Sequence, residues 1–211
     1  MTKEQKPKLY IIAGPTAVGK TKASLLFAKK MNAEIISADS MQVYRGMDIG
    51  TAKLREDEMD GIRHHLIDIL SPFEEFNIAI FKELAKKAIE DIHSRGKEAV
   101  LVGGTGFYIQ SVLYDTDFTT GDSDKGLRES LSLEYDEKGA GYMYNKLKAL
   151  DEKAAESIHP NNKKRIIRAI EYALSTDKKI SEHNINERAK KSPYNYKYFV
   201  LNLERKKLYN R

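Results

Sequence analysis

The chain has 211 residues, and its 36 lysines and arginines outnumber its 31 aspartates and glutamates, which gives a formal net charge of +5. Hydrophobic residues make up 41% and charged residues 32%, a composition typical of soluble globular proteins. No segment approaches the roughly 20 apolar residues of a membrane span, and the polar N-terminus predicts no export signal. The absence of cysteine excludes disulfides, thiolate metal sites and cysteine nucleophiles. We therefore expect a cytoplasmic protein with no membrane contact.

The first 115 residues alternate short apolar segments with helical patterns. Strands are expected at residues 9–13, 34–39, 65–69 and 99–102, and helices are expected after Lys20 and between the Asn77 cap and Gly96. Strands that alternate with helices predict a parallel sheet with helices on both faces. The predicted fold class is therefore α/β.

The pattern changes after residue 115. Helices are expected near residues 126–138, 141–150, 152–158, 161–175 and 181–190, before a strand at 196–203 and a helix at 204–211. We interpret this order as an all-helical insertion in one sheet. The predicted domains are an α/β core of residues 1–115 and 195–211 and a helical insertion of residues 116–194.

The positive charge is concentrated in the second half of the chain. Residues 1–120 carry 16 basic and 17 acidic side chains, whereas residues 146–211 carry 17 basic and 8 acidic ones. A basic segment beside a nearly neutral one indicates contact with a polyanion. Solvated lysine-rich helix faces would produce the same distribution, so the charge alone leaves both interpretations open.

A phosphate-binding motif follows the first predicted strand. The residues Gly14, Pro15, Thr16, Ala17, Val18, Gly19, Lys20 and Thr21 match G-x-x-x-x-G-K-[ST] at every fixed position. The glycines allow backbone N–H groups to surround phosphate oxygens, the lysine adds a positive charge, and Thr21 can ligate Mg²⁺. The motif is typical of nucleotide and ATP sites, but it could hold any diphosphate.

Two further strand ends carry polar residues. Asp39 follows the second predicted strand, and Gly103, Gly104 and Thr105 follow the fourth. Ligands of doubly wound sheets bind beyond the carboxyl ends of the strands, so these residues are expected to converge on the phosphate loop. Asp39 could act as a base, but it could also support Mg²⁺ or cap a helix, and Thr105 could be a simple helix cap. The fourth strand lacks the terminal aspartate of a motor ATPase, which counts against that class.

Four motifs in this order resemble the tRNA dimethylallyltransferase (IPP transferase) family. They are residues 14–21, residues 39–53 (DSMQVYRGMDIGTAK), residues 101–108 (LVGGTGFY), and residues 159–162 (HPNN) with Arg165 and Arg168. The resemblance implies a P-loop NTPase-like sheet with a helical insertion. It also implies transfer of the dimethylallyl group of dimethylallyl diphosphate to N6 of the adenosine 3′-adjacent to the anticodon of a tRNA.

The resemblance assigns roles to the residues near the phosphate loop. Asp39 would be the general base, Gln42 would help to read the adenine, and Thr105 would lie at the reacting centre and touch the tRNA. Lys20 and Thr21, with Mg²⁺ as cofactor, would stabilise the departing diphosphate, which Arg211 would also bind.

Contacts with the tRNA anticodon stem-loop follow in the same way from the resemblance. They would come from Asp39, Ser40, Met41, Gln42, Thr105, Arg128, Lys164, Arg165, Ile166, Ile167 and Arg168. Family members continue beyond the point at which this chain stops, so a C-terminally truncated member is expected, and it is expected to be a monomer.

Other functions remain open at this point. A P-loop small-molecule kinase could use the same loop with Asp39 as its base, but it would not need the basic insertion. An adenylate isopentenyltransferase would keep the chemistry and accept AMP instead of tRNA. A P-loop protein that binds RNA without catalysis would make Asp39 dispensable.

Overall fold

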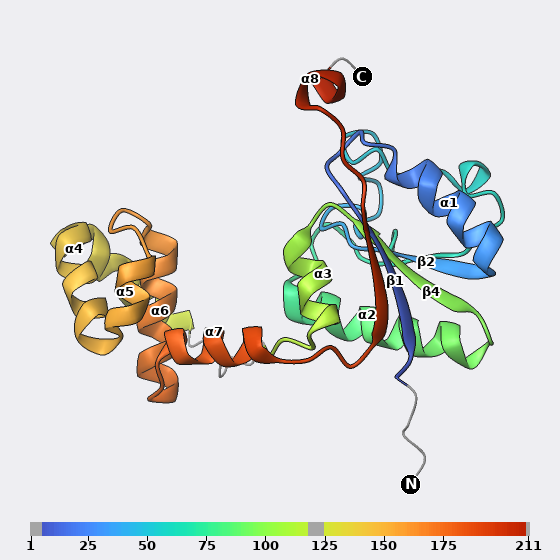
Figure 1. Ribbon diagram of the computed structural model, residues 1–211. Coiled ribbons are helices and arrows are strands. Elements are labelled where there is room, and N and C mark those ends of the chain that lie inside the picture. The colour runs from blue at the N-terminus through green and yellow to red at the C-terminus, as the bar shows by residue number, and fades with distance from the viewer. Residues whose placement is uncertain (1–5, 118–124, 210–211) are drawn as a thin grey trace, which may run out of the picture. The chain divides into compact units, whose positions relative to one another are not determined.

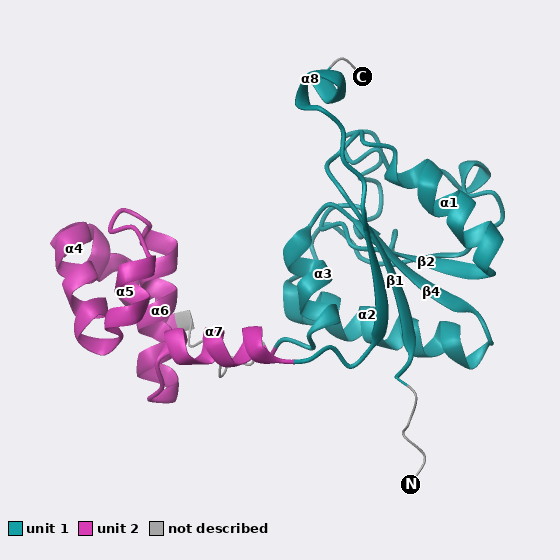
Figure 2. Cartoon of the chain, in the orientation of Figure 1, with its two compact units in different colours: residues 1–116, 191–211 teal, residues 117–190 magenta. Residues whose placement is uncertain are grey.

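The computed structural model describes residues 6–117 and 125–209, and Figure 1 shows their helices and strands. The chain divides into two compact units, residues 1–116 with 191–211 and residues 117–190 (Figure 2). Among the described residues, no helix is both long and apolar enough to cross a membrane.

The first unit is built on a five-stranded parallel sheet in the order β3-β2-β4-β1-β5. Its strands are β1 (Lys8–Ala13), β2 (Ala33–Ser37), β3 (His64–His65), β4 (Glu98–Gly103) and β5 (Asn195–Val200). Its helices are α1 (Lys20–Met31), α2 (Ile78–Ser94), α3 (Gly106–Leu113) and α8 (Arg205–Tyr209), with a short 3₁₀ turn at Glu56–Glu58. The predicted α/β class with a parallel sheet is confirmed.

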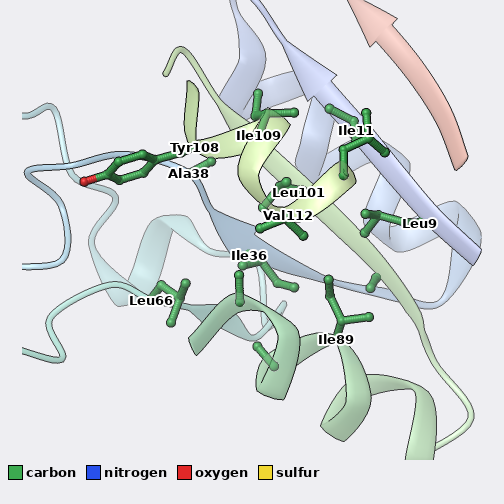
Figure 3. Close-up of a cluster of buried hydrophobic side chains, with 14 of the residues drawn as sticks. Leu9, Ile11, Ile36, Ala38, Leu66, Ile89, Leu101, Tyr108, Ile109 and Val112 are labelled. Carbon is green, nitrogen blue, oxygen red and sulfur yellow. The ribbon is translucent and has the colours of Figure 1, made fainter. Parts of the chain in front are cut away.

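Helices cover both faces of this sheet because its central strands are apolar on both sides. Leu9 and Ile11 of β1 face α2 and α3, and this cluster of buried side chains is drawn in Figure 3. Tyr10 and Ile12 alternate with them and pack on the opposite face with Ala28 of α1. Side chains of successive strand residues point to opposite faces, so a continuous apolar segment such as β1 is buried twice.

The second unit is helical throughout its described part. It contains α4 (Lys125–Leu150), α5 (Glu152–Ser157), α6 (Lys163–Thr176) and α7 (Ile180–Ala189). Gly139 breaks α4 with a φ of 81°, at the boundary between the two helices that the sequence predicts there. The buried Asp151 caps α5 and also accepts hydrogen bonds from the backbone and hydroxyl of Ser181.

A buried carboxylate ties β2 to the end of α2. Glu34 is only 2% exposed, and it accepts hydrogen bonds from Arg95 and, over 2.9 Å, from Lys97 Nζ. His65 Nε2 lies 2.7 Å from its Oε2 atom. The hydrogen bonds from Arg95 above all, and those from His65 and Lys97, hold the pKa of Glu34 well below its usual value although burial opposes them.

We expect Glu34→Gln to lower the free energy of unfolding at pH 7 by about 2 kcal/mol, because it removes the charge-assisted hydrogen bonds that the buried carboxylate accepts from Arg95 and Lys97. The depressed pKa means that the stability from Glu34 is present above the ordinary glutamate value of 4.5 and is lost as the pH falls below it. The difference in the free energy of unfolding between wild type and variant, measured by denaturant titration, should therefore become smaller at acid pH. Glu90→Gln, at an exposed position of α2, is the control. A gap of equal size at pH 7 and in acid would contradict this account.

Candidate active site at the carboxyl ends of the strands

A cavity of about 480 Å³ lies at the carboxyl ends of β1, β2 and β4, within the first unit. Its walls include Lys20 and Thr21 of the phosphate motif, Asp39 and Gln42 from the loop after β2, and Gly104 after β4. The carboxyl ends of β1, β2 and β4, which the sequence predicts to converge, therefore meet around one cavity.

The phosphate motif forms the turn from β1 into α1. Gly19 has a φ of 99°, a conformation that favours glycine, and it directly precedes the helix. The chain that follows β5 passes close to Gly14. A Cβ atom at Gly14 would lie 2.5 Å from the carbonyl oxygen of Leu201, so a larger residue does not fit there. The loop thus directs the N-terminus of a 12-residue helix at the cavity, an arrangement that binds anions.

Lys20 lies folded over the phosphate loop. Its Nζ donates to the carbonyl oxygens of Gly14 at 2.9 Å and Pro15 at 2.8 Å. Burial lowers the pKa of Lys20, and the nearby Asp39 carboxylate partly opposes that shift. The lysine and the aspartate therefore interact across the same cavity.

Asp39 occupies the loop that follows β2, two residues beyond the end of the strand. Its Oδ1 atom accepts hydrogen bonds from the backbone N–H groups of Met41 at 2.8 Å and Gln42 at 3.3 Å. The carboxylate thus fixes its own turn with one oxygen, and the chain continues there as turns and not as a helix that Asp39 could cap. Among the described residues, no hydrogen-bond donor contacts its other oxygen, which leaves Oδ2 available as a proton acceptor.

Gln42 lines the cavity, but both ends of its amide are engaged. Its Oε1 accepts from the Ser37 hydroxyl at 3.1 Å, and its Nε2 donates to the Thr51 carbonyl oxygen at 3.1 Å. Contact of Gln42 with an adenine stays a prediction, since these bonds would have to be shared or exchanged. In the present arrangement, the side chain connects β2 to the loop around Thr51.

Sequence reasoning did not single out Lys53, the last residue of the second motif. Its buried Nζ donates to the Tyr44 carbonyl oxygen at 2.7 Å and to Asp48 and Asp68 at 2.8 and 2.6 Å. Burial opposes the charge, but the bonds to Asp48 and Asp68 raise the pKa of Lys53 overall. Lys53 therefore holds together the loop that carries Asp39.

Thr105 follows the two glycines and stands at the N-cap position of α3. Its side chain makes no capping hydrogen bond, so the structure does not support a role as a simple cap. The residue is half-buried and adjoins Gly104 of the cavity wall. Its hydroxyl is thus not used to cap α3, the alternative role that the sequence left open.

Gly103 brings β4 unusually close to the chain that leads to Asp39. A Cβ atom at this position would collide with the backbone carbonyl and the side chain of Ala38. We expect Gly103→Ala to destabilise the protein by about 2 kcal/mol, the cost of overpacking a close contact. Thermal and denaturant unfolding would measure it, with Gly106→Ala as control because an added Cβ there meets nothing within 4 Å. Equal stability of the two variants would contradict the close-approach explanation.

In the helical unit, the predicted RNA-binding residues separate into two groups. Lys164 and Arg165 are exposed on α6, but Ile166 and Ile167 are 0% and 6% exposed and pack in the core of the unit. The two isoleucine side chains are used for packing between helices, so contact of these residues with tRNA stays a prediction and would have to involve their backbone. Arg211 lies outside the described residues.

Comparison with known proteins gives the family. A family model described as IPP transferase matches residues 42–211. The chain belongs to the IPP transferase family. The resemblance carried by the sequence motifs is thereby confirmed.

Curated relatives of this family are similar over nearly the whole chain. A tRNA dimethylallyltransferase of Lachnoclostridium phytofermentans is 57% identical over 201 residues, which are 95% of this chain and 64% of the relative. One of Bacillus subtilis is 48% identical over 206 residues, 98% of this chain and 65% of the relative. The chain thus spans just under two thirds of the length of these relatives.

Solved structures of IPP transferase relatives agree with the fold. A eukaryotic dimethylallyltransferase described as acting on tRNA matches with a TM-score of 0.85 and 34% identity, over 97% of this chain and 50% of that one. A tRNA isopentenylpyrophosphate transferase of Staphylococcus epidermidis matches with a TM-score of 0.62 and 45% identity, over 98% of this chain and 67% of that one.

Proposed function

We propose that the chain transfers the dimethylallyl group of dimethylallyl diphosphate to N6 of the adenosine 3′-adjacent to the anticodon of a tRNA. The products are N6-isopentenyladenosine in the tRNA and diphosphate. The observation that carries this proposal is the single cavity that joins a phosphate loop to Asp39. Curated relatives that bear the name tRNA dimethylallyltransferase support the same activity.

The geometry suits an alkyl transfer to a weakly nucleophilic amine. A bond forms between N6 and the first carbon of the dimethylallyl group while the bond from that carbon to the diphosphate oxygen breaks. Asp39 accepts the N6 proton through its free oxygen, as a general base near the reacting atoms does. Lys20 and the N-terminus of α1 stabilise the negative charge on the departing diphosphate.

Magnesium fits this cavity as a partner of the diphosphate. The Thr21 hydroxyl lines the cavity, and it is an oxygen ligand of the kind Mg²⁺ prefers. In the described part of the chain, no cluster of three or more histidines and carboxylates could hold a metal ion. Most ligands of a bound ion would therefore come from phosphate and water, and the ion would neutralise charge on the leaving group.

The exposed cations in the first turn of α6 support an RNA substrate. Lys164 and Arg165 are exposed there, and cationic side chains bind the RNA backbone without reading its sequence. The target adenosine must leave the base stack to reach an enclosed site, as in other enzymes that act on a base. We place the reaction in the cytoplasm and assign it to a monomer, because one chain supplies both the loop and the base.

The test is a transfer assay with dimethylallyl diphosphate, Mg²⁺ and an anticodon stem-loop RNA, read by mass spectrometry of the digested RNA. We expect the adenosine 3′-adjacent to the anticodon to gain one dimethylallyl group. Parallel reactions replace the RNA with AMP, or supply ATP in place of the prenyl donor. Modification of AMP in preference to RNA would favour an adenylate isopentenyltransferase, and phosphate transfer from ATP would favour a kinase.

A further inference from the structure

A buried carboxylate in the helical unit holds two arginines that come from different helices. Glu171 of α6 is only 2% exposed. Its Oε2 accepts hydrogen bonds from Nη2 and Nε of Arg128, at 2.8 and 3.2 Å, and from Nη1 of Arg168 at 3.3 Å. Arg128 lies 43 residues earlier, in the first turns of α4, so the carboxylate joins the two helices through their cations.

The arrangement has more positive charge than a buried carboxylate requires. One arginine with two hydrogen bonds already compensates a carboxylate, yet here two arginines share a single oxygen. The Oε1 atom is buried and has no hydrogen-bond partner among the described residues. The group as a whole keeps one net positive charge.

Both arginines remain open to solvent. The side chain of Arg128 is 50% exposed and that of Arg168 is 37% exposed. In the described part of the chain, neither arginine pairs with another carboxylate, and a guanidinium carries five N–H donors, so each keeps donors for a further partner. These are properties of a binding group as well as of a structural ion pair.

We propose that Glu171 is a positioning residue for RNA binding, which orients Arg128 and Arg168 so that their remaining N–H groups bind a phosphate of the RNA backbone. The inference rests on the proposed function, which supplies the RNA. A planar guanidinium held at one edge presents its other edge in a fixed direction, and this geometry matches the oxygens of a phosphate. Glu171 itself touches no RNA.

For the Glu171→Gln variant, the proposal and simple electrostatics predict opposite changes in RNA affinity. Glu171→Gln removes a negative charge next to two arginines, so charge alone predicts tighter RNA binding. Positioning predicts the opposite. We expect the dissociation constant of a labelled anticodon stem-loop RNA to rise about 10-fold for the variant, and the salt dependence of binding to fall by about one phosphate contact. Fluorescence anisotropy titrations at several salt concentrations, without prenyl donor, measure both quantities.

The matched control is Glu156→Gln, which makes the same charge change at an exposed position of α5. It should bind RNA as tightly as wild type or slightly more tightly. In transfer assays, Glu171→Gln should raise the KM for RNA and leave kcat at saturating RNA unchanged. Circular dichroism melts verify that each variant is folded.

Two variants keep the test decisive if Glu171→Gln does not fold. Arg128→Lys and Arg168→Lys retain the charge but lose the planar fork, and each should weaken RNA binding several-fold. If both lysine variants bind RNA with wild-type affinity, the inference is overturned. It is also overturned if folded Glu171→Gln binds RNA as tightly as wild type or more tightly. Neither result contradicts the proposed function. A wild-type chain that does not bind the RNA overturns the inference together with the RNA substrate of the proposed function.

Discussion

Replacing Asp39 with asparagine is expected to lower kcat for dimethylallyl transfer by about 10³-fold, the range typical of a lost general base. Asparagine has nearly the same shape, and its Oδ1 can still accept the hydrogen bonds from the backbone of Met41 and Gln42. It cannot take the proton that leaves N6. The chemical step should fail while the loop keeps its conformation.

Single-turnover assays at saturating dimethylallyl diphosphate and RNA measure this effect directly. RNA binding, followed by anisotropy, should change little, because the substitution leaves the helical unit untouched. Asp57→Asn, an exposed aspartate of the same unit, is the control and should keep wild-type transfer. Transfer by Asp39→Asn at more than a tenth of the wild-type rate would rule out Asp39 as the base. Full activity of the variant, with RNA bound, would show in addition that the Asp39 side chain serves only to fix its turn.

The elements set by local pattern could be predicted from sequence. The Asn77 cap is an example, because the cap depends only on residues two and three positions further along, and its side chain does accept from Ala79 and Ile80. The third strand was predicted too long for a different reason. Leu66 and Asp68 have φ values of 62° and 54°, which end the strand after His65, and nothing in those residue types requires this conformation.

The candidate site likewise contains residues that the sequence can identify and residues that it cannot. The phosphate loop can be found from sequence because its glycines and lysine lie within eight residues. Lys53 and Glu171 could not, because their roles depend on partners 15 and 43 residues away in the chain. The burial of Ile166 and Ile167 could have been predicted, since they continue an apolar stripe with Ile170 at helical spacing.

Replacing Lys20 with methionine should lower kcat for transfer by about 10²-fold to 10³-fold, as loss of one preorganised group that stabilises transition-state charge does. Methionine fills similar space without charge. The Nζ atom lies among the carbonyl oxygens of Gly14 and Pro15, at the loop where the diphosphate would be held, so the charge is in position before substrate arrives. Lys22→Met, at an exposed position of the same helix, should retain transfer and is the control.

The pKa of Lys20 gives a second test that does not depend on removing the charge. Burial lowers this pKa below the usual 10.5, so the free enzyme loses the charge at a lower pH than an exposed lysine would. Because kcat/KM reports ionisations of the free enzyme, kcat/KM for dimethylallyl diphosphate should decline on the alkaline side before pH 10.5. Lys20→Arg keeps its charge at that pH, and its alkaline decline should move upward even if its maximal rate is lower. An identical alkaline limb in both proteins would show that Lys20 does not supply the charge that the diphosphate meets.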